Sequence, residues 1–174
     1  AGRFSYSSSN NPSKPADYGN VVMTNCYADG DVTGLPASDE KGTVGGLIGT
    51  TMIGNYITVN HCYAAGNIAA AAGTTRMGGL IGHPGLDGVY FTPKNLVVTD
   101  NVVLSAVLSG LADSGVYCRV VGLGDKSESA AGGTFKNNLV VDSMTLGGKA
   151  FAGESGDNVQ GTTCEAAKLQ EKAT

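Results

Sequence analysis

An eight-residue block that recurs 36 residues later constrains the fold of this chain more than any other feature. Residues 25–32 read NCYADGDV, and residues 61–68 read HCYAAGNI. Weaker copies of the block begin at Asn101 and at Asn138. A fixed period of this length is typical of proteins in which similar units stack on one another, because one unit alone cannot bury its apolar face.

A second block recurs in phase with the first. The sequence GGLIG at residues 45–49 returns at residues 78–82, and CRVVG at residues 118–122 takes the same place in the third unit. Ala1 and Gly2 resemble the last two residues of one more such block. The chain is therefore expected to hold about four units and to begin inside a unit.

Small or apolar residues alternate with polar ones in the copies of the first block, which predicts half-buried strands. The residues expected to face inward in the first three copies are Cys26, Ala28, Gly30 and Val32, then Cys62, Ala64, Gly66 and Ile68, and then Val102, Leu104, Ala106 and Leu108. Tyr27 and Tyr63 then share an outward column, which is expected to continue as Val103 and Val140. This column is either covered by loops of the chain or is a contact surface, and loop cover is favoured.

The alternation reverses its phase at Asn25 and at His61, which predicts a corner in the backbone there. Asn tolerates the left-handed conformation that corners use. His61 is therefore interpreted as a corner residue rather than a catalytic one.

We expect residues 1–160 to form an all-β domain, a parallel β-solenoid of about four repeats. Residues 162–165 (TTCE) offer a helix-capping pattern. Residues 161–174 are accordingly expected to form a short helix or a linker to a downstream segment. The chain looks like a fragment of a larger protein.

Composition agrees with this architecture and excludes several classes of partner. Glycine supplies 27 of the 174 residues, roughly twice its usual share, which is too much for a helical protein. The net charge is −4, and no run of basic residues occurs, so nucleic acid is not an expected partner. No apolar stretch is long enough to cross a bilayer, so this segment is not expected to insert into a membrane.

The two blocks together, GGLIG and NCYADGDV, resemble the GLUG repeat of bacterial surface proteins. Residues 21–82 match the pattern well, and residues 83–146 match it loosely. The resemblance implies an exported, extracellular protein of the bacterial cell surface, often adhesin-like. It also implies a second role, because the repeat flanks the peptidase unit of some immunoglobulin-A-cleaving metallopeptidases. It implies no catalytic residues for the repeat itself.

Few residues of the chain offer catalytic chemistry. There are two histidines, of which His83 is interpreted as a solvated loop residue, and no HExxH motif is present. Asp29 and Asp31 lie on an outward strand face, but Ala65 and Asn67 replace them one unit later, so a paired acid and base is not maintained. We therefore expect no enzyme, no cofactor and no metal site, with adventitious calcium at scattered loop aspartates left open.

The four cysteines give two expectations. Cys26 and Cys62 occupy the same inward site in successive units, where parallel neighbours point their side chains the same way, so both are expected to be reduced. Cys118 and Cys164 lie outside that ladder, and the sequence leaves their pairing open.

The function expected from the sequence is a non-catalytic, adhesin-like or stalk module of an exported bacterial protein. It would bind a host or microbial glycan or a surface protein and would contact other domains of its parent chain. Binding is assigned to the polar loops at residues 5–19, 33–41, 82–93 and 125–133 and to the surface residues Tyr27, Asp29, Asp31, Tyr63 and Asn67. The alternative is a polysaccharide-cleaving β-helix enzyme, or a spacer domain beside a peptidase.

Overall fold

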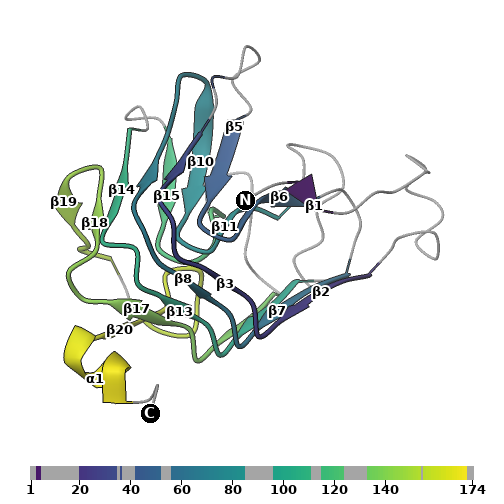
Figure 1. Cartoon of the computed structure of the whole chain (residues 1–174), viewed down its shortest axis with the longest axis vertical. Coiled ribbons are helices and arrows are strands. Elements are labelled where there is room, and N and C mark those ends of the chain that lie inside the picture. Colours follow the sequence, from purple (N-terminus) through teal and green to yellow (C-terminus); the bar gives the residue numbers. More distant parts are fainter. Residues whose placement is uncertain are drawn as a thin grey trace.

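The structure, a computed structural model, describes residues 3–4, 20–34, 36, 42–51, 56–84, 96–110, 115–123, 133–153 and 155–171. This part of the chain is all-β apart from one short helix, and its strands form five sheets in which every pair except β18–β19 is parallel (Figure 1).

Sheet A contains β1 (Arg3–Phe4), β6 (Ile48–Thr51) and β11 (Ile81–His83). Sheet B contains β2 (Asn20–Thr24), β7 (Tyr56–Asn60), β12 (Leu96–Thr99) and β16 (Thr134–Lys136). Sheet C contains β3 (Tyr27–Ala28), β8 (Tyr63–Ala64), β13 (Val102–Val103), β17 (Leu139–Val141) and β20 (Thr162–Cys164). Sheet D contains β4 (Val32–Thr33), β9 (Ile68–Ala69), β14 (Val107–Ser109), β18 (Thr145–Leu146) and β19 (Lys149–Ala150). Sheet E contains β5 (Gly42–Gly45), β10 (Thr74–Gly78) and β15 (Val116–Cys118).

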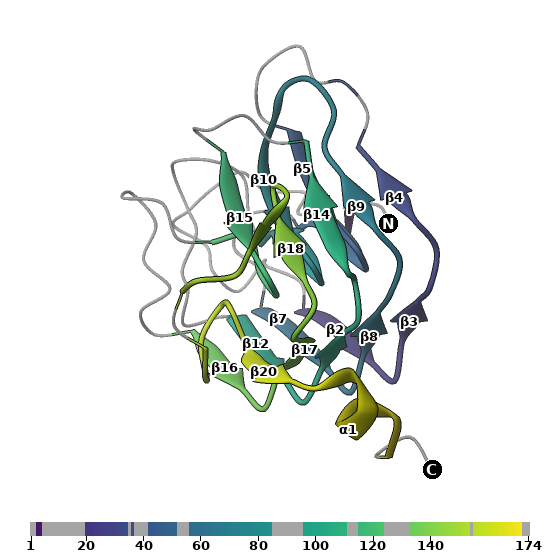
Figure 2. The same ribbon diagram turned by 90° about the vertical axis from the view of Figure 1, so that its left-hand side faces the viewer.

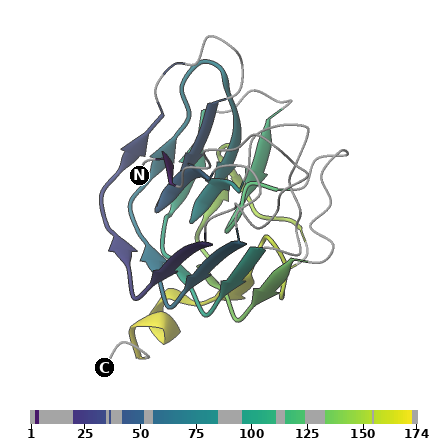
Figure 3. The same cartoon turned by 90° about the vertical axis from the view of Figure 1, so that its right-hand side faces the viewer.

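Successive units of the sequence repeat lie side by side in these sheets. We call the units coils: the first is β2–β6, the second β7–β11, the third β12–β15 with Val121, and the fourth β16–β19. Figure 3 shows the four strands of sheet B next to one another in the colour order of the sequence. The parallel pairing of repeated strands that the sequence predicted is confirmed.

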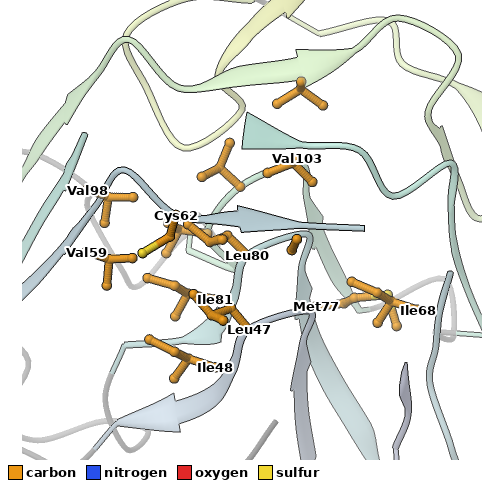
Figure 4. Close-up of a cluster of buried hydrophobic side chains, with 14 of the residues drawn as sticks. Leu47, Ile48, Val59, Cys62, Ile68, Met77, Leu80, Ile81, Val98 and Val103 are labelled. Atoms are coloured by element: carbon orange, nitrogen blue, oxygen red, sulfur yellow. The ribbon is translucent and has the colours of Figure 1, made fainter. Parts of the chain in front are cut away.

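The GGLIG blocks also pair as the sequence predicted. Gly78 pairs with Gly45 on one side and with Cys118 on the other, and Ile81 pairs with Ile48 and Val121. Their apolar side chains point into the core beside Val59, Val98 and Ile68 (Figure 4). Ile48 and Ile81 are fully buried, so this short block supplies both a turn of the backbone and the centre of the core.

A corner follows every strand of sheet B. Asn25, His61, Asp100 and Asn137 occupy it, with φ between 51° and 58°. The corner expected at Asn25 and His61 is therefore confirmed. Asp and Asn are the side chains that best tolerate this left-handed conformation, which explains why the third and fourth coils use them.

The phase expected directly after the corner in the third and fourth coils is wrong by one residue, whereas Leu108 pairs with Ile68 and is buried as expected. Tyr63 pairs with Val102, not Val103, and Val102 pairs with Leu139. Val103 and Val140, expected on the outward column, are both 0% exposed. Leu104 and Ala106, expected inside, are exposed, whereas Ser105 is buried. The error arose because Asn101 and Asn138 were aligned with the corner, while they occupy the inward site of Cys62.

The inward glycines expected in the first two coils are also misplaced. Gly30 is exposed, and Gly66 is half-buried with φ +89°, where a Cβ would overlap the carbonyl of Gly30. Both residues form a second bend, between sheets C and D. Only Cys62, Ala64 and Ile68 of the second block are buried in the core.

Two buried asparagines hold the inward site after the corner in the third and fourth coils. Asn101 is 0% exposed, and its Oδ1 accepts the N–H of Cys62 at 2.9 Å. Its Nδ2 donates to the carbonyl of Val59 at 3.0 Å and to Oδ1 of Asn138 at 2.9 Å. The Nδ2 of Asn138 donates in turn to the carbonyl of Val98 at 2.8 Å. The side chains therefore satisfy backbone groups that the corner removes from the ladder.

The C-terminal end of the stack is closed by three elements. Gly147 and Gly148, both with positive φ, turn β18 back on β19 as an antiparallel hairpin, a turn type that favours glycine. Strand β20 then pairs with β17, inside the segment expected as helix or linker. The expected short helix follows as α1 (Ala166–Glu171), which lies outside sheet C near β20 in Figures 1 and 2.

A first prediction concerns the close approach of coils at the GGLIG block. A Cβ at Gly79 would overlap the carbonyl oxygen of Arg119, a backbone atom that cannot move aside. Gly79→Ala should therefore lower the free energy of unfolding by about 3 kcal/mol. Gly30→Ala is the matched control, because a Cβ there meets nothing within 4 Å, and it should stay within about 0.5 kcal/mol of the parent. Equal stability of the two variants in denaturant titrations would show that the coils are not packed this closely.

A second prediction concerns the asparagine ladder. Asn101→Ala leaves the N–H of Cys62 and the carbonyl of Val59 buried without these partners, which should cost about 2–4 kcal/mol. Asn101→Cys should cost less, since a cysteine fills this site in the second coil and its sulfur bonds backbone groups there. Chemical unfolding of both variants measures the difference. An alanine variant as stable as the parent would contradict the assigned hydrogen bonds.

Candidate functional site

Two stacked tyrosines stand on the outer face of sheet C. Tyr27 of β3 pairs with Tyr63 of β8, and their ring centroids lie 5.3 Å apart with the planes inclined by 13°. Tyr27 is 64% exposed and Tyr63 is 38% exposed. The loop cover favoured for this column from the sequence is therefore wrong for its aromatic part, which lies open to solvent.

In the third and fourth coils, the same column consists of half-buried aliphatic side chains instead of exposed aromatic ones. It continues as Val102 and Leu139, which are half-buried and pack against the hydrophobic core cluster. Leu169 of α1 belongs to that cluster and is 9% exposed. Helix α1 lies on the same side of sheet C (Figure 2), and the two tyrosines form the solvent-exposed part of the column.

Asp31 and Asn67 lie at the bend between sheets C and D. Oδ1 of Asp31 accepts the backbone N–H of Asn67 at 2.7 Å, and both residues are exposed. Asp29 is exposed too, and in the described part of the chain its carboxylate forms no hydrogen bond. In the second coil Ala65 and Asn67 replace these acids, so the two carboxylates of the first coil have no acidic counterpart beside them.

The structure thus joins four of the five predicted ligand residues in two contacts between adjoining coils. Tyr27 contacts Tyr63, and Asp31 contacts Asn67, while Asp29 stands between the two pairs in the sequence of the first coil. Most residues of the four polar loops that were also assigned to binding lie outside the described ranges. Within the described residues, this surface is therefore aromatic at β3 and β8 and carries carboxylate and amide groups at the neighbouring bend.

The corner of the third coil carries a carboxyl group with a perturbed pKa, Asp100. Asn137 donates from Nδ2 to Oδ1 of Asp100 at 2.9 Å, and this bond lowers the pKa of Asp100, assisted by a hydrogen bond from Thr99 and by the charge of His61. A lowered pKa means that this contact stabilises the fold above the ordinary range of aspartate and is lost as the pH falls below it. The contact links the corners of the third and fourth coils. The sequence alignment missed Asp100 because it placed Asn101 at the corner.

His83 is not the solvated loop residue that the sequence indicated. It lies in β11, pairs with Thr50 and is 1% exposed. Because its side chain is inside the stack, it is not available to a ligand in solution. His61 remains at the exposed corner with φ 51°.

Arg119 is the most unusual buried group, and the sequence analysis did not single it out. It occupies the place of Gly79 in the third coil and is 1% exposed. Its guanidinium donates to the carbonyls of Gln160 and Gly161 and to Oγ1 of Thr163, and lies 3.9 Å from the ring centroid of Phe151. Burial lowers the pKa of Arg119. These contacts hold the C-terminal closing segment against the third coil. The signal for this role in the sequence is an arginine at the position where the other two blocks have the second glycine of GGLIG.

The cysteines follow the pattern expected for the first two coils. All four are free thiols, and the N–H of Cys26 lies 3.4 Å from Sγ of Cys62. Cys118 and Cys164, whose pairing the sequence left open, are not bonded to each other. Burial raises the pKa of Cys118 to about 11, which makes this thiol a poor nucleophile at neutral pH.

The described residues contain neither a metal-ligand cluster nor a membrane-spanning helix. Within those ranges, no group of three or more His, Cys, Asp or Glu side chains is placed to hold a metal ion. No helix in the same part of the chain is long and apolar enough to cross a membrane.

Comparisons with protein-family models, with curated proteins and with solved structures find no match to this chain.

Proposed function

We propose that this chain is a β-solenoid of GLUG-type repeats that acts as a non-catalytic adhesive or stalk module of an exported bacterial surface protein. The parallel pairing of coil upon coil supports the solenoid, since one strand from each repeat enters each of several sheets in turn. A stack of this kind grows along one axis as repeats are added. It suits a module that holds a binding surface away from the cell.

The observation that carries the adhesive part of the proposal is the exposed pair Tyr27 and Tyr63. The two stacked rings form a continuous exposed aromatic surface, and tyrosine combines an apolar ring with a hydroxyl that donates and accepts hydrogen bonds. The apolar face of a sugar ring can pack on such a ring. The nearby Asp29, Asp31 and Asn67 then offer acceptors and an amide to its hydroxyl groups.

The arrangement of the acids favours binding over hydrolysis. Glycoside hydrolysis by the common mechanisms uses two carboxyl groups on opposite sides of the bond that is cleaved, one of them with a raised pKa. Asp29 and Asp31 are neighbours on one exposed bend, and Asp31 is already bonded to the backbone of Asn67. The proposed ligand is therefore a host or microbial glycan, held by stacking and hydrogen bonds.

The test replaces both aromatic rings. Tyr27→Ala with Tyr63→Ala should reduce binding to a panel of immobilised host and microbial glycans by at least tenfold, while the melting temperature changes little because both side chains are exposed. Tyr56→Ala is the matched control, since Tyr56 is 52% exposed on sheet B and outside the stacked pair, and it should bind as the parent does.

Three results would count against the proposal. Retained glycan binding by the double variant would remove the tyrosines from the site. A large fall in melting temperature would show that the pair serves the fold instead. A parent chain that binds no glycan would withdraw the adhesive role and leave the stalk role.

A further inference from the structure

The two ends of the stack are finished differently. At the C-terminal end, the inward residues Phe135, Val140 and Met144 of the fourth coil are no more than 6% exposed, and only Leu146 of sheet D is half-buried among the inward residues of its described strands. At the other end, the inward residues of the first coil are half-buried although they pack on the same core, namely Val21, Met23, Cys26, Ala28 and Val32. Their neighbours in the second coil are between 0 and 2% exposed, namely Ile57, Val59, Cys62, Ala64 and Ile68. The core is therefore covered over most of its C-terminal end and open at the other.

The open end also presents strand edges. Strands β2, β3, β4 and β5 are each the last strand of their sheet on this side, and the first coil forms one edge of the ribbon in Figures 2 and 3. In the second coil, the N–H groups of Tyr63 and Ala65 donate to the carbonyls of Cys26 and Ala28. The equivalent N–H groups of the first coil, on Tyr27 and Asp29, have no such acceptor within the described residues.

Strand β1 shows where a further coil would lie. It pairs with β6 in parallel, with Arg3 opposite Thr50, on the side of the first coil away from the second. His83 pairs with the same Thr50 from the other side. Arg3 therefore occupies the position of His83 in a coil whose other four strands would cover β2, β3, β4 and β5. One strand of the next layer is thus already in place and sets its direction and register.

Two further features of the first coil fit such an additional coil beside it. Tyr63 covers one face of the Tyr27 ring, and the opposite face points toward the layer that β1 occupies. A cavity of about 270 Å³ opens beside β4, β5 and β6, lined almost wholly by residues of the first coil, including Val32, Thr33 and Val44. An inward side chain of a further coil would fill such a space, as Ile68 covers Val32 in the present stack.

We propose that the N-terminal end of the stack is a docking surface for one more coil of the same repeat, which enters in parallel and in register and ends in β1. The further coil would form backbone hydrogen bonds with β2, β3, β4 and β5. Its small apolar side chains would pack over Val21, Met23 and Ala28. An aromatic residue over Tyr27 would extend the stacked pair. This surface is distinct from the outward face of the tyrosines and does not depend on glycan binding.

The test supplies such a coil from the chain itself. Residues 56–82 are placed directly before Arg3, in place of Ala1 and Gly2, so that Gly82 precedes Arg3 as it precedes His83 in the second coil. The control has the same extension with its copies of Ile57, Val59 and Ile68 changed to Asp. These changes keep the length but remove the apolar side chains that would cover the first coil.

Hydrogen exchange of the full-length proteins provides the readout. In the extended protein, the amides of Tyr27 and Asp29 should exchange roughly tenfold or more slowly than in the parent, because they gain carbonyl acceptors. In the control they should exchange as in the parent. The melting temperature should rise for the extended protein alone.

Two results would overturn the proposal. One is equal exchange of these amides in all three proteins. The other is sedimentation of the parent as a dimer that the extension converts to a monomer, because the end would then serve a second copy of the chain instead.

Discussion

The parallel backbone ladder between successive coils is the constraint on which the rest of this structure depends. Each strand offers its N–H and C=O groups to both neighbours, so a coil is satisfied only when another lies on each side of it. The close approach at the GGLIG blocks follows from this ladder. Leu47 and Ile48 both donate to the carbonyl of Leu80, and Leu80 and Ile81 both donate to that of Val120. A Cβ at Gly46 would overlap the carbonyl oxygen of Gly79, and a Cβ at Gly79 would overlap that of Arg119, which explains the glycine at these two positions.

The sequence predicted the placement of residues correctly where two copies of the repeat align without a gap. The blocks at residues 25–32 and 61–68 differ by no insertion, and Tyr27, Tyr63, Cys26 and Cys62 lie where the alternation placed them. The third and fourth coils were misaligned by one position because Asn serves two purposes here. It tolerates the corner, as Asn25 does, and it also fills the buried site behind the corner, as Asn101 does. Residue type alone does not separate these uses, whereas the Cβ direction in the structure does.

The site was predicted less completely than the fold. Outward positions in the first coil were identified correctly, because exposure follows from alternation. Whether loops would cover the tyrosines depended on segments with no repeat pattern, and the sequence favoured the wrong answer. Arg119 shows the same limit. Its burial depends on Gln160, Gly161 and Phe151, about 30 to 40 residues further along the chain, and no local pattern connects them. The stack is thus finished at the C-terminal end by contacts specific to this chain, while the other end keeps the repeat's own edge.

Nuclear Overhauser contacts between backbone protons of successive coils would test the parallel, in-register stack most directly. The account predicts cross-strand contacts that place Tyr63 opposite Tyr27 and Val102 opposite Tyr63, with Leu139 next along the same column. Contacts that placed Val103 opposite Tyr63, or antiparallel contacts between β3 and β8, would contradict it.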